Sequence, residues 1–176
     1  MIEIKDKKDC AGCTACTEIC PKKCIQMKPD EEGFLYPVVD KNRCVECNAC
    51  NMVCPIQNPI TEEEKPQKAY LVQHCDEKVR LDSSAGGAFT AIATVVLQRG
   101  GVVFGAAYDE NFHVQHTYVE AVNELKRFRN SKYVQSDLGD SFCLVKDFLQ
   151  KDRWVCFSGT PCQIEGLSKF LRKPYE

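Results

Sequence analysis

The chain has 176 residues, 44% of them hydrophobic and 27% charged, and its formal net charge is −2. This balance is typical of a globular protein and, with no basic tract, argues against nucleic-acid binding. The longest strongly apolar stretch, residues 89–97, is too short to span a bilayer, and the first ten residues lack the apolar core of a secretory signal. We therefore expect a cytoplasmic protein without a membrane span.

The first third of the chain is expected to contain short strands. Hydrophobic alternation predicts strands at residues 2–4, 24–27 and 34–39. The segment DEEG at 30–33 has the composition of a turn, so the second and third strands are expected to pair as a hairpin. This hairpin separates two cysteine-rich runs.

The cysteines are concentrated in this part of the chain, because nine of the thirteen lie in the first 54 residues. Without an export signal, such a concentration indicates metal or redox chemistry rather than disulfides. Eight of the nine form two copies of the pattern C-x2-C-x2-C-x3-C-P, at 10–21 and 44–55. The ninth, Cys24, lies outside the pattern and is expected to be a buried small side chain.

The repeated pattern predicts two [4Fe–4S] clusters. Three thiolates within seven residues can bind three corners of one cubane, while the fourth cysteine of such a run binds the other cluster of the pair. The proline that follows has a fixed φ, which helps to redirect the chain. The predicted ligands are Cys10, Cys13, Cys16 and Cys54 for the first cluster, and Cys44, Cys47, Cys50 and Cys20 for the second.

Zinc ions and disulfides are the alternatives, although zinc sites usually use paired C-x2–4-C knuckles. The region resembles a bacterial-type ferredoxin with two [4Fe–4S] clusters. After it, residues 57–68, QNPITEEEKPQK, contain two prolines and three consecutive glutamates, a composition that indicates a linker or an exposed loop. We expect a ferredoxin-type domain at 1–60, a linker at 61–68 and a second domain at 69–176.

The second domain is predicted to alternate strands with helices. Strands are expected at 69–75, 101–108, 113–119 and 154–158. Helices are expected at 89–97, 121–128, 138–149 and 164–171. The fold class is then α+β, a two-cluster ferredoxin domain followed by a mixed α/β domain. Because the last helix has no following strand, we expect this second domain to be incomplete. His113 and His116 are expected at the surface or at a sheet edge.

Two stretches of the second domain have the composition of ligand-binding turns. SSAGGAF, at 83–89, places small residues at a predicted helix start, where Ser83 or Ser84 can cap the helix and backbone N–H groups can bind an anion. A simple cap followed by a close glycine contact explains it equally well. FSGTPCQ, at 157–163, fits a capping box with Thr160 as the N-cap, and it places Cys162 in a first helical turn, where the dipole favours a thiolate.

Three ordered segments resemble the β subunit of coenzyme F-420-reducing hydrogenases and dehydrogenases. They are SSAGGAFTAIATVVLQRGGVVFGAAYDENF, NSKYVQSDLGDSF and FSGTPCQIEGL, and the resemblance covers most of residues 69–176. In that family FAD mediates between one-electron clusters and a two-electron hydride acceptor, which is coenzyme F-420 in some members. The resemblance implies FAD, a redox partner protein or subunit, and a small-molecule hydride acceptor. Family members usually continue beyond the end of this chain.

The resemblance also implies where cofactor and substrate would lie. Cys162 is the candidate catalytic or cofactor-adjacent thiol. The candidate flavin-binding residues are Ser83, Ser84, Gly86, Gly87, Lys132, Tyr133, Gln135, Ser158, Gly159 and Thr160.

Three functions follow from this sequence. The first is an iron–sulfur flavoprotein oxidoreductase, or its N-terminal portion, in which electrons cross the clusters to FAD and leave as a hydride. The second is a non-enzymatic ferredoxin-type electron carrier whose α/β part docks a partner enzyme. A zinc-dependent interaction module is the third.

Overall fold

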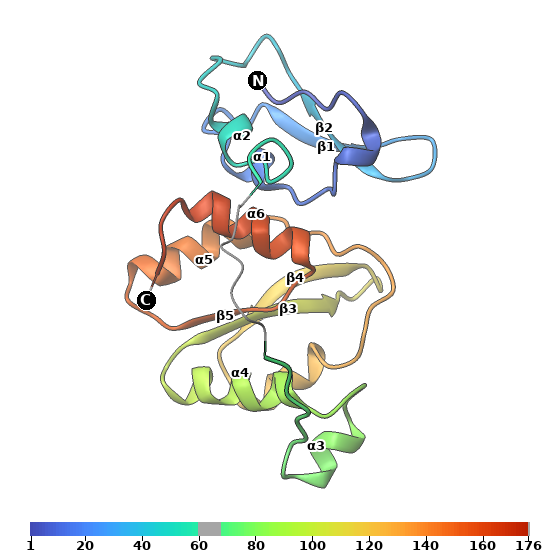
Figure 1. Ribbon diagram of the computed structural model, residues 1–176, viewed down its shortest axis with the longest axis vertical. Coiled ribbons are helices and arrows are strands. Elements are labelled where there is room, and N and C mark those ends of the chain that lie inside the picture. The colour runs from blue at the N-terminus through green and yellow to red at the C-terminus, as the bar shows by residue number, and fades with distance from the viewer. Residues whose placement is uncertain (60–67, 176) are drawn as a thin grey trace. The chain divides into compact units, whose positions relative to one another are not determined.

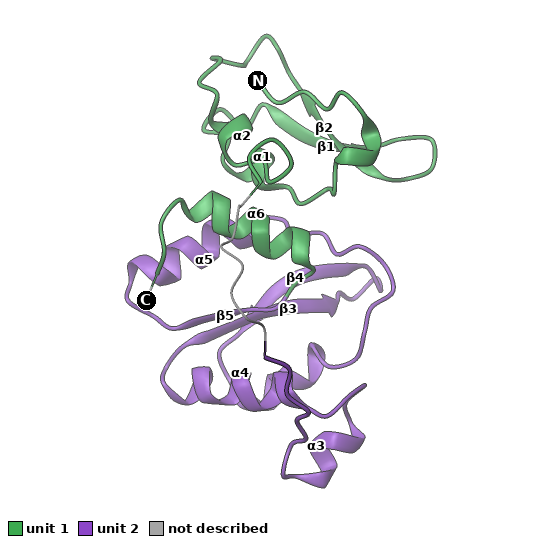
Figure 2. Cartoon of the chain, in the orientation of Figure 1, with its two compact units in different colours: residues 1–62, 159–176 green, residues 63–158 purple. Residues whose placement is uncertain are grey.

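The computed structural model describes residues 1–59 and 68–175, which form two compact units. The first unit comprises Met1–Glu62 together with Gly159–Glu176, and the second comprises Glu63–Ser158 (Figure 2). Except for Lys68, the predicted linker at 61–68 lies outside the described residues. The final helix is therefore grouped with the cysteine-rich unit, whereas the sequence assigned it to the second domain. No helix in the described part of the chain is long and apolar enough to cross a membrane.

The first unit is built from short elements, shown in Figure 1. They are η1 (Lys7–Asp9), α1 (Ala15–Glu18), β1 (Ile25–Pro29), β2 (Leu35–Val39), α2 (Ala49–Met52) and α6 (Pro161–Leu171). The predicted hairpin is confirmed, since β1 and β2 pair antiparallel with Ile25 opposite Val39. Its turn is held by the Asp30 carboxylate, which accepts the backbone N–H groups of Glu32 and Phe34 at 3.0 Å each.

The strand predicted at residues 2–4 is absent. Ile2 is instead buried among cysteines, and its backbone N–H lies 3.1 Å from the Sγ atom of Cys50. The alternation of this segment therefore reflects one buried side chain and not a paired strand.

The two cysteine runs share an unusual backbone. In each copy, the residues on either side of the second cysteine have positive φ: Gly12 (63°) and Thr14 (59°) in the first, Glu46 (52°) and Asn48 (63°) in the second. Left-handed residues flanking Cys13 and its counterpart Cys47 curl the chain into a tight loop, after which α1 and α2 begin. Residue types that tolerate this region, glycine and asparagine, occupy two of the four positions.

Thr14 and Glu46 are less suitable, because a side chain with a Cβ in the left-handed region costs about 1–2 kcal/mol and neither belongs to the residue types that tolerate it. Replacing Glu46 with glycine removes this cost and adds backbone entropy to the unfolded chain, for an expected net stabilisation of about 0.5–1 kcal/mol. Hydrogen exchange of peptides from residues 1–59 measures this unit separately from the rest. Gly12→Ala, the reverse change in the first copy, is expected to weaken protection; weaker protection in Glu46→Gly would contradict the strain argument.

The second unit is a three-stranded sheet with a helix on each face (Figure 1). Its elements are α3 (Glu77–Leu81), α4 (Ala88–Gln98), β3 (Val102–Tyr108), β4 (Val114–Val119), η2 (Val122–Arg127), α5 (Ser141–Gln150) and β5 (Val155–Phe157). The strand order is β4-β3-β5, with β3 antiparallel to β4 and parallel to β5. The mixture of helices and sheets agrees with the predicted α+β class.

The central strand β3 is buried on both faces because its side chains alternate between two cores. Val103 and Ala107 pack with Ala93 and Val96 of α4, and with Phe128 after η2. On the other face, the ring of Phe104 lies 6.1 Å from that of Phe148 in α5 and 5.9 Å from that of Phe157 in β5. A near-continuous apolar strand is what a sheet covered on both sides requires.

Three sequence predictions for this unit differ from the structure. Residues 69–75 form no strand, and Leu71 is fully exposed. The N-cap of α4 is Gly87, in the left-handed region, and not Ser83 or Ser84. The helix predicted at 121–128 is the 3-10 helix η2. In each case the local composition was compatible with the prediction, but the hydrogen-bonding partners were decided by the surrounding chain.

Candidate metal centre

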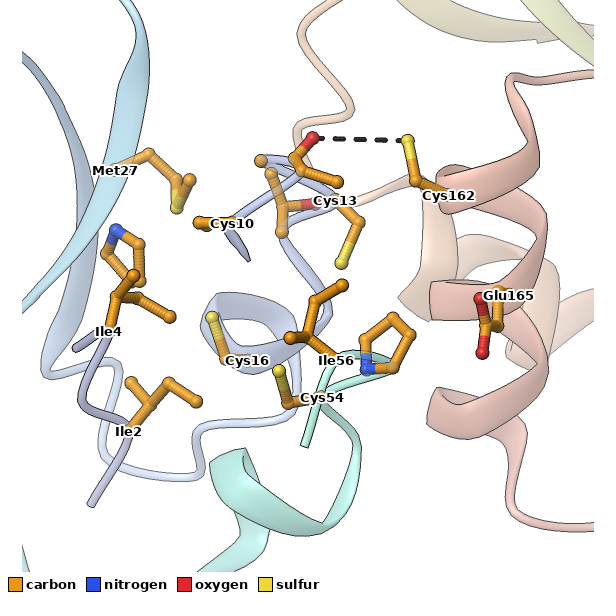
Figure 3. Close-up of a pocket in the computed structure, with 15 residues that line it drawn as sticks. Ile2, Ile4, Cys10, Cys13, Cys16, Met27, Cys54, Ile56, Cys162 and Glu165 are labelled. Carbon is orange, nitrogen blue, oxygen red and sulfur yellow. Dashed lines mark hydrogen bonds between the residues drawn. The ribbon is translucent and has the colours of Figure 1, made fainter. Parts of the chain in front are cut away.

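The first pocket of the cysteine-rich unit is lined by Cys10, Cys13, Cys16 and Cys54. Figure 3 shows these side chains gathered around one space, together with Ile2, Ile4, Met27 and Ile56. Three of the cysteines come from the first run, and the fourth ends the second run. Thiol sulfurs thus meet in a largely apolar environment.

The second pocket has the complementary set, Cys20, Cys44, Cys47 and Cys50. Here three cysteines come from the second run and the fourth ends the first. The position of α1 explains this exchange. Cys16 lies in this one-turn helix and its thiol lines the first pocket, whereas Cys20 lies just beyond the helix and its thiol lines the second. The structure therefore brings together the four members of each ligand set that the repeat predicts.

The donors suit iron–sulfur clusters, which are held by cysteine thiolates. Burial is the largest influence on the Cys13 and Cys16 thiols, and it raises the pKa of Cys13 to about 11 and that of Cys16 to about 12. A metal must displace these protons, since only a thiolate is a ligand, and the gain on binding then stabilises the fold. Within residues 1–59 and 68–175, no three His, Cys, Asp or Glu side chains are arranged to hold a single metal ion.

Helix α6 adds a further thiol to the first pocket. It begins with the predicted capping box of Thr160 and Gln163, with Pro161 in the first turn. This start directs Cys162 to the pocket wall, where its Sγ atom lies 3.9 Å from the carbonyl oxygen of Ala11 (Figure 3). One turn later, a Cβ on Gly166 would lie only 3.2 Å from the Sγ atom of Cys13. The candidate catalytic thiol thus lies beside a predicted cluster ligand, a contact that its sequence context did not indicate.

Three of the candidate flavin residues of the second unit make hydrogen bonds to other residues of that unit. Ser84 donates its hydroxyl to the Asn130 side chain at 3.0 Å, which joins the 83–89 and 130–142 segments. Lys132 donates to the carbonyl oxygens of Arg127 and Arg129, and burial lowers its pKa. Ser83 bonds instead to the Val79 carbonyl.

The remaining members of that set differ in their surroundings. Gly86 must lack a side chain, because a Cβ there would overlap the Val72 carbonyl oxygen. Tyr133 is 94% exposed. Gly159 and Thr160 belong to the first unit, whereas Ser158, Gln135 and Gly87 belong to the second.

His116 was expected at the surface or at a sheet edge, and it lies in β4, an edge strand of the sheet, but not at the surface. The side chain is buried and stacks on Phe157, with ring centroids 5.1 Å apart. Its Nε2 atom lies 3.0 Å from the Ser158 carbonyl oxygen, so Nε2 carries the proton, and Nδ1 can then accept from the Ser136 hydroxyl at 2.8 Å. Alternation from Val114 in β4 places His116 on the buried face, and this signal was present in the sequence.

The stability of the second unit is expected to fall as the pH drops below about 6.5. Burial lowers the pKa of His116 from its ordinary value of 6.5, although the hydrogen bond to Ser158 opposes this shift. Between 6.5 and the folded-state pKa, the unfolded chain binds more protons than the folded one, so acid favours unfolding. Urea midpoints at pH 7.5 and 5.5, followed by fluorescence of Trp154, measure the effect. His116→Gln should show a smaller pH dependence, and an unchanged dependence would assign the effect to other groups.

A family model for a 4Fe-4S dicluster domain matches residues 9–58. Comparison with curated proteins found no match. The matched segment contains both cysteine runs and the hairpin between them. Residues 9–58 therefore form a ferredoxin-type 4Fe–4S dicluster domain, which supports iron–sulfur clusters as cofactors and electron transfer as the chemistry.

Proposed function

We propose that this protein transfers electrons through two [4Fe–4S] clusters, the first held by Cys10, Cys13, Cys16 and Cys54, and the second by Cys44, Cys47, Cys50 and Cys20. The observation that carries the proposal is the exchange of the fourth cysteine between the two pockets. This exchange is the arrangement expected of paired clusters.

The surrounding residues support one-electron chemistry, which the clusters supply when bound. Apolar side chains such as Ile4 and Met27 keep water from the first pocket. The backbone N–H of Ile2 points at the sulfur of Cys50, and hydrogen bonds to ligand sulfurs raise a cluster's reduction potential. The bond from Ile2 is therefore expected to raise the potential of the second cluster.

Iron and acid-labile sulfide in anaerobically purified protein test this function. We expect about eight iron atoms and about eight sulfides per chain, with an EPR signal after reduction. Stoichiometric zinc in place of iron would contradict the proposal and favour an interaction module.

A second candidate function is a FAD-dependent oxidoreductase, in which the second unit contributes to a flavin site. The contacts of Ser84 with Asn130, and of His116 with Ser136 and Ser158, favour this candidate, because they link all three segments that resemble the F-420 hydrogenase and dehydrogenase β subunits. Electrons would come from a redox partner protein or subunit, and the product would be a reduced hydride acceptor such as coenzyme F-420.

Flavin released by acid from the anaerobically purified protein distinguishes the two functions. About one FAD per chain would support the oxidoreductase, because the flavin supplies the two-electron chemistry that clusters lack. Full iron content without flavin would favour the electron carrier, whose second unit then serves to dock a partner enzyme.

A further inference from the structure

The second pocket is the more exposed of the two predicted cluster sites. All eight predicted ligands lie within residues 1–59, and among them Cys47 alone is exposed, whereas the four ligands of the first pocket are buried or half-buried. The loop that carries Cys47 also presents an apolar side chain to solvent, because Val45 is 56% exposed. Both residues line the second pocket. A redox protein that docks on this loop would therefore come close to a predicted ligand.

Exposed cations lie beside this loop. We call them the basic rim, and they are Lys22, Lys23, Lys41 and Arg43. They come from two segments that are separated in the sequence by the hairpin, so that no single stretch of the chain is strongly basic. The two segments meet where the Arg43 Nη2 atom donates to the Lys22 carbonyl oxygen at 3.0 Å. Lys22 lines the same pocket as Val45 and Cys47, which places the basic rim at the exposed ligand.

Neighbouring carboxylates do not neutralise the basic rim. In the described part of the chain, none of its four side chains forms an ion pair. Asp40 and Glu46 are the acidic residues of segments 20–24 and 40–48, and the Asp40 carboxylate accepts the backbone N–H of Asn42 at 3.0 Å. Near the first cysteine run, by contrast, Lys7 pairs with Asp30 at 3.0 Å. The second pocket thus has a local excess of positive charge on a chain whose net charge is −2.

We propose that the basic rim docks an acidic one-electron redox protein, which exchanges an electron with the second cluster. This inference rests on the two-cluster function proposed above. One electron passes from the reduced carrier to the oxidised cluster, so the carrier is oxidised and the cluster is reduced, and no bond is made or broken and no proton moves. Electron-transfer complexes have small interfaces, and surface charges of opposite sign steer the encounter and orient the partners.

Nucleic acid is the other kind of molecule that an unpaired basic surface attracts. The position of the basic rim favours a redox protein instead. Val45 provides an apolar centre beside the charges, which is the usual anatomy of a protein–protein interface, and the exposed Cys47 has a use only for a partner that exchanges electrons.

The test measures the dissociation constant of an acidic plant-type [2Fe–2S] ferredoxin for the anaerobically purified full chain. Between ionic strengths of about 0.02 and about 0.2 M, we expect binding to the wild type to weaken by about tenfold or more. Lys22→Glu with Arg43→Glu should weaken binding by about tenfold or more at the lower ionic strength and reduce the salt dependence. The matched control, Lys5→Glu with Lys28→Glu, changes the net charge equally outside the second pocket and should bind as the wild type does.

Equal weakening in the two double variants would overturn the proposal, because the effect would then follow total charge alone. Tighter binding of cytochrome c, a basic one-electron protein, or of duplex DNA would overturn it as well. If the rim variant loses iron, Lys22→Glu alone replaces it, since Arg43 contacts the backbone of Lys22 and not its side chain, and it should still weaken binding by about threefold.

Iron and sulfide are measured in the same wild-type preparation. Wild-type protein without iron and sulfide would refute the two-cluster function itself. An iron-loaded chain that fails to bind the ferredoxin, or that binds it equally at both ionic strengths, would refute only the docking site.

Discussion

Replacing Cys47 with serine is expected to remove or degrade the second cluster, lowering iron from about eight to about four to seven atoms per chain. A serine hydroxyl stays protonated where a thiol can become a thiolate, so it is a poor iron ligand. Cys24, which also lines this pocket, is not placed to substitute for Cys47, because its thiol lies against Cys20 and interacts with Cys44. Iron analysis and EPR of the reduced protein measure the loss, and electron transfer through the second cluster should stop.

Cys75→Ser is the matched control for this variant. Cys75 is an exposed thiol of the second unit, outside both pockets. It should keep the full iron content and the wild-type EPR signal. Unchanged iron and undiminished electron transfer in Cys47→Ser would refute the assignment of the second ligand set.

Replacing Phe104 with alanine is expected to lower the free energy of unfolding of the second unit by about 3–5 kcal/mol. Phe104 is completely buried, and its ring lies 5.4 Å from Tyr118 as well as against Phe148 and Phe157. The truncation removes apolar contacts from all three neighbours and leaves a cavity at the centre of the sheet. Urea unfolding followed by Trp154 fluorescence measures the effect.

The iron content of Phe104→Ala should remain near that of the wild type, because the cysteine pockets belong to the other unit. Phe112→Ala is the control, since Phe112 is 82% exposed and its truncation should change stability by no more than about 0.5 kcal/mol. A loss below about 1 kcal/mol in Phe104→Ala would show that the core does not depend on this ring.

Short-range patterns in the sequence were sufficient for much of the candidate site. The repeated cysteine spacing predicted the two ligand sets because three thiols within seven residues can converge only through a tight local loop. The same holds for the turn at Asp30 and for the capping box at Thr160, whose hydrogen bonds join residues no more than four positions apart. Alternation was also enough for the hairpin, since β1 and β2 are close in sequence.

Only the tertiary structure decided which residues distant in sequence meet. His116 is buried through a bond to Ser158, 42 residues away, and Cys162 reaches a pocket whose nearest contact, Ala11, is 151 residues away. Residues 69–75 have the composition of a strand, but no strand in the described part of the chain pairs with them. Such contacts depend on how apolar faces pack and on which backbone groups find partners, and no local pattern encodes that choice.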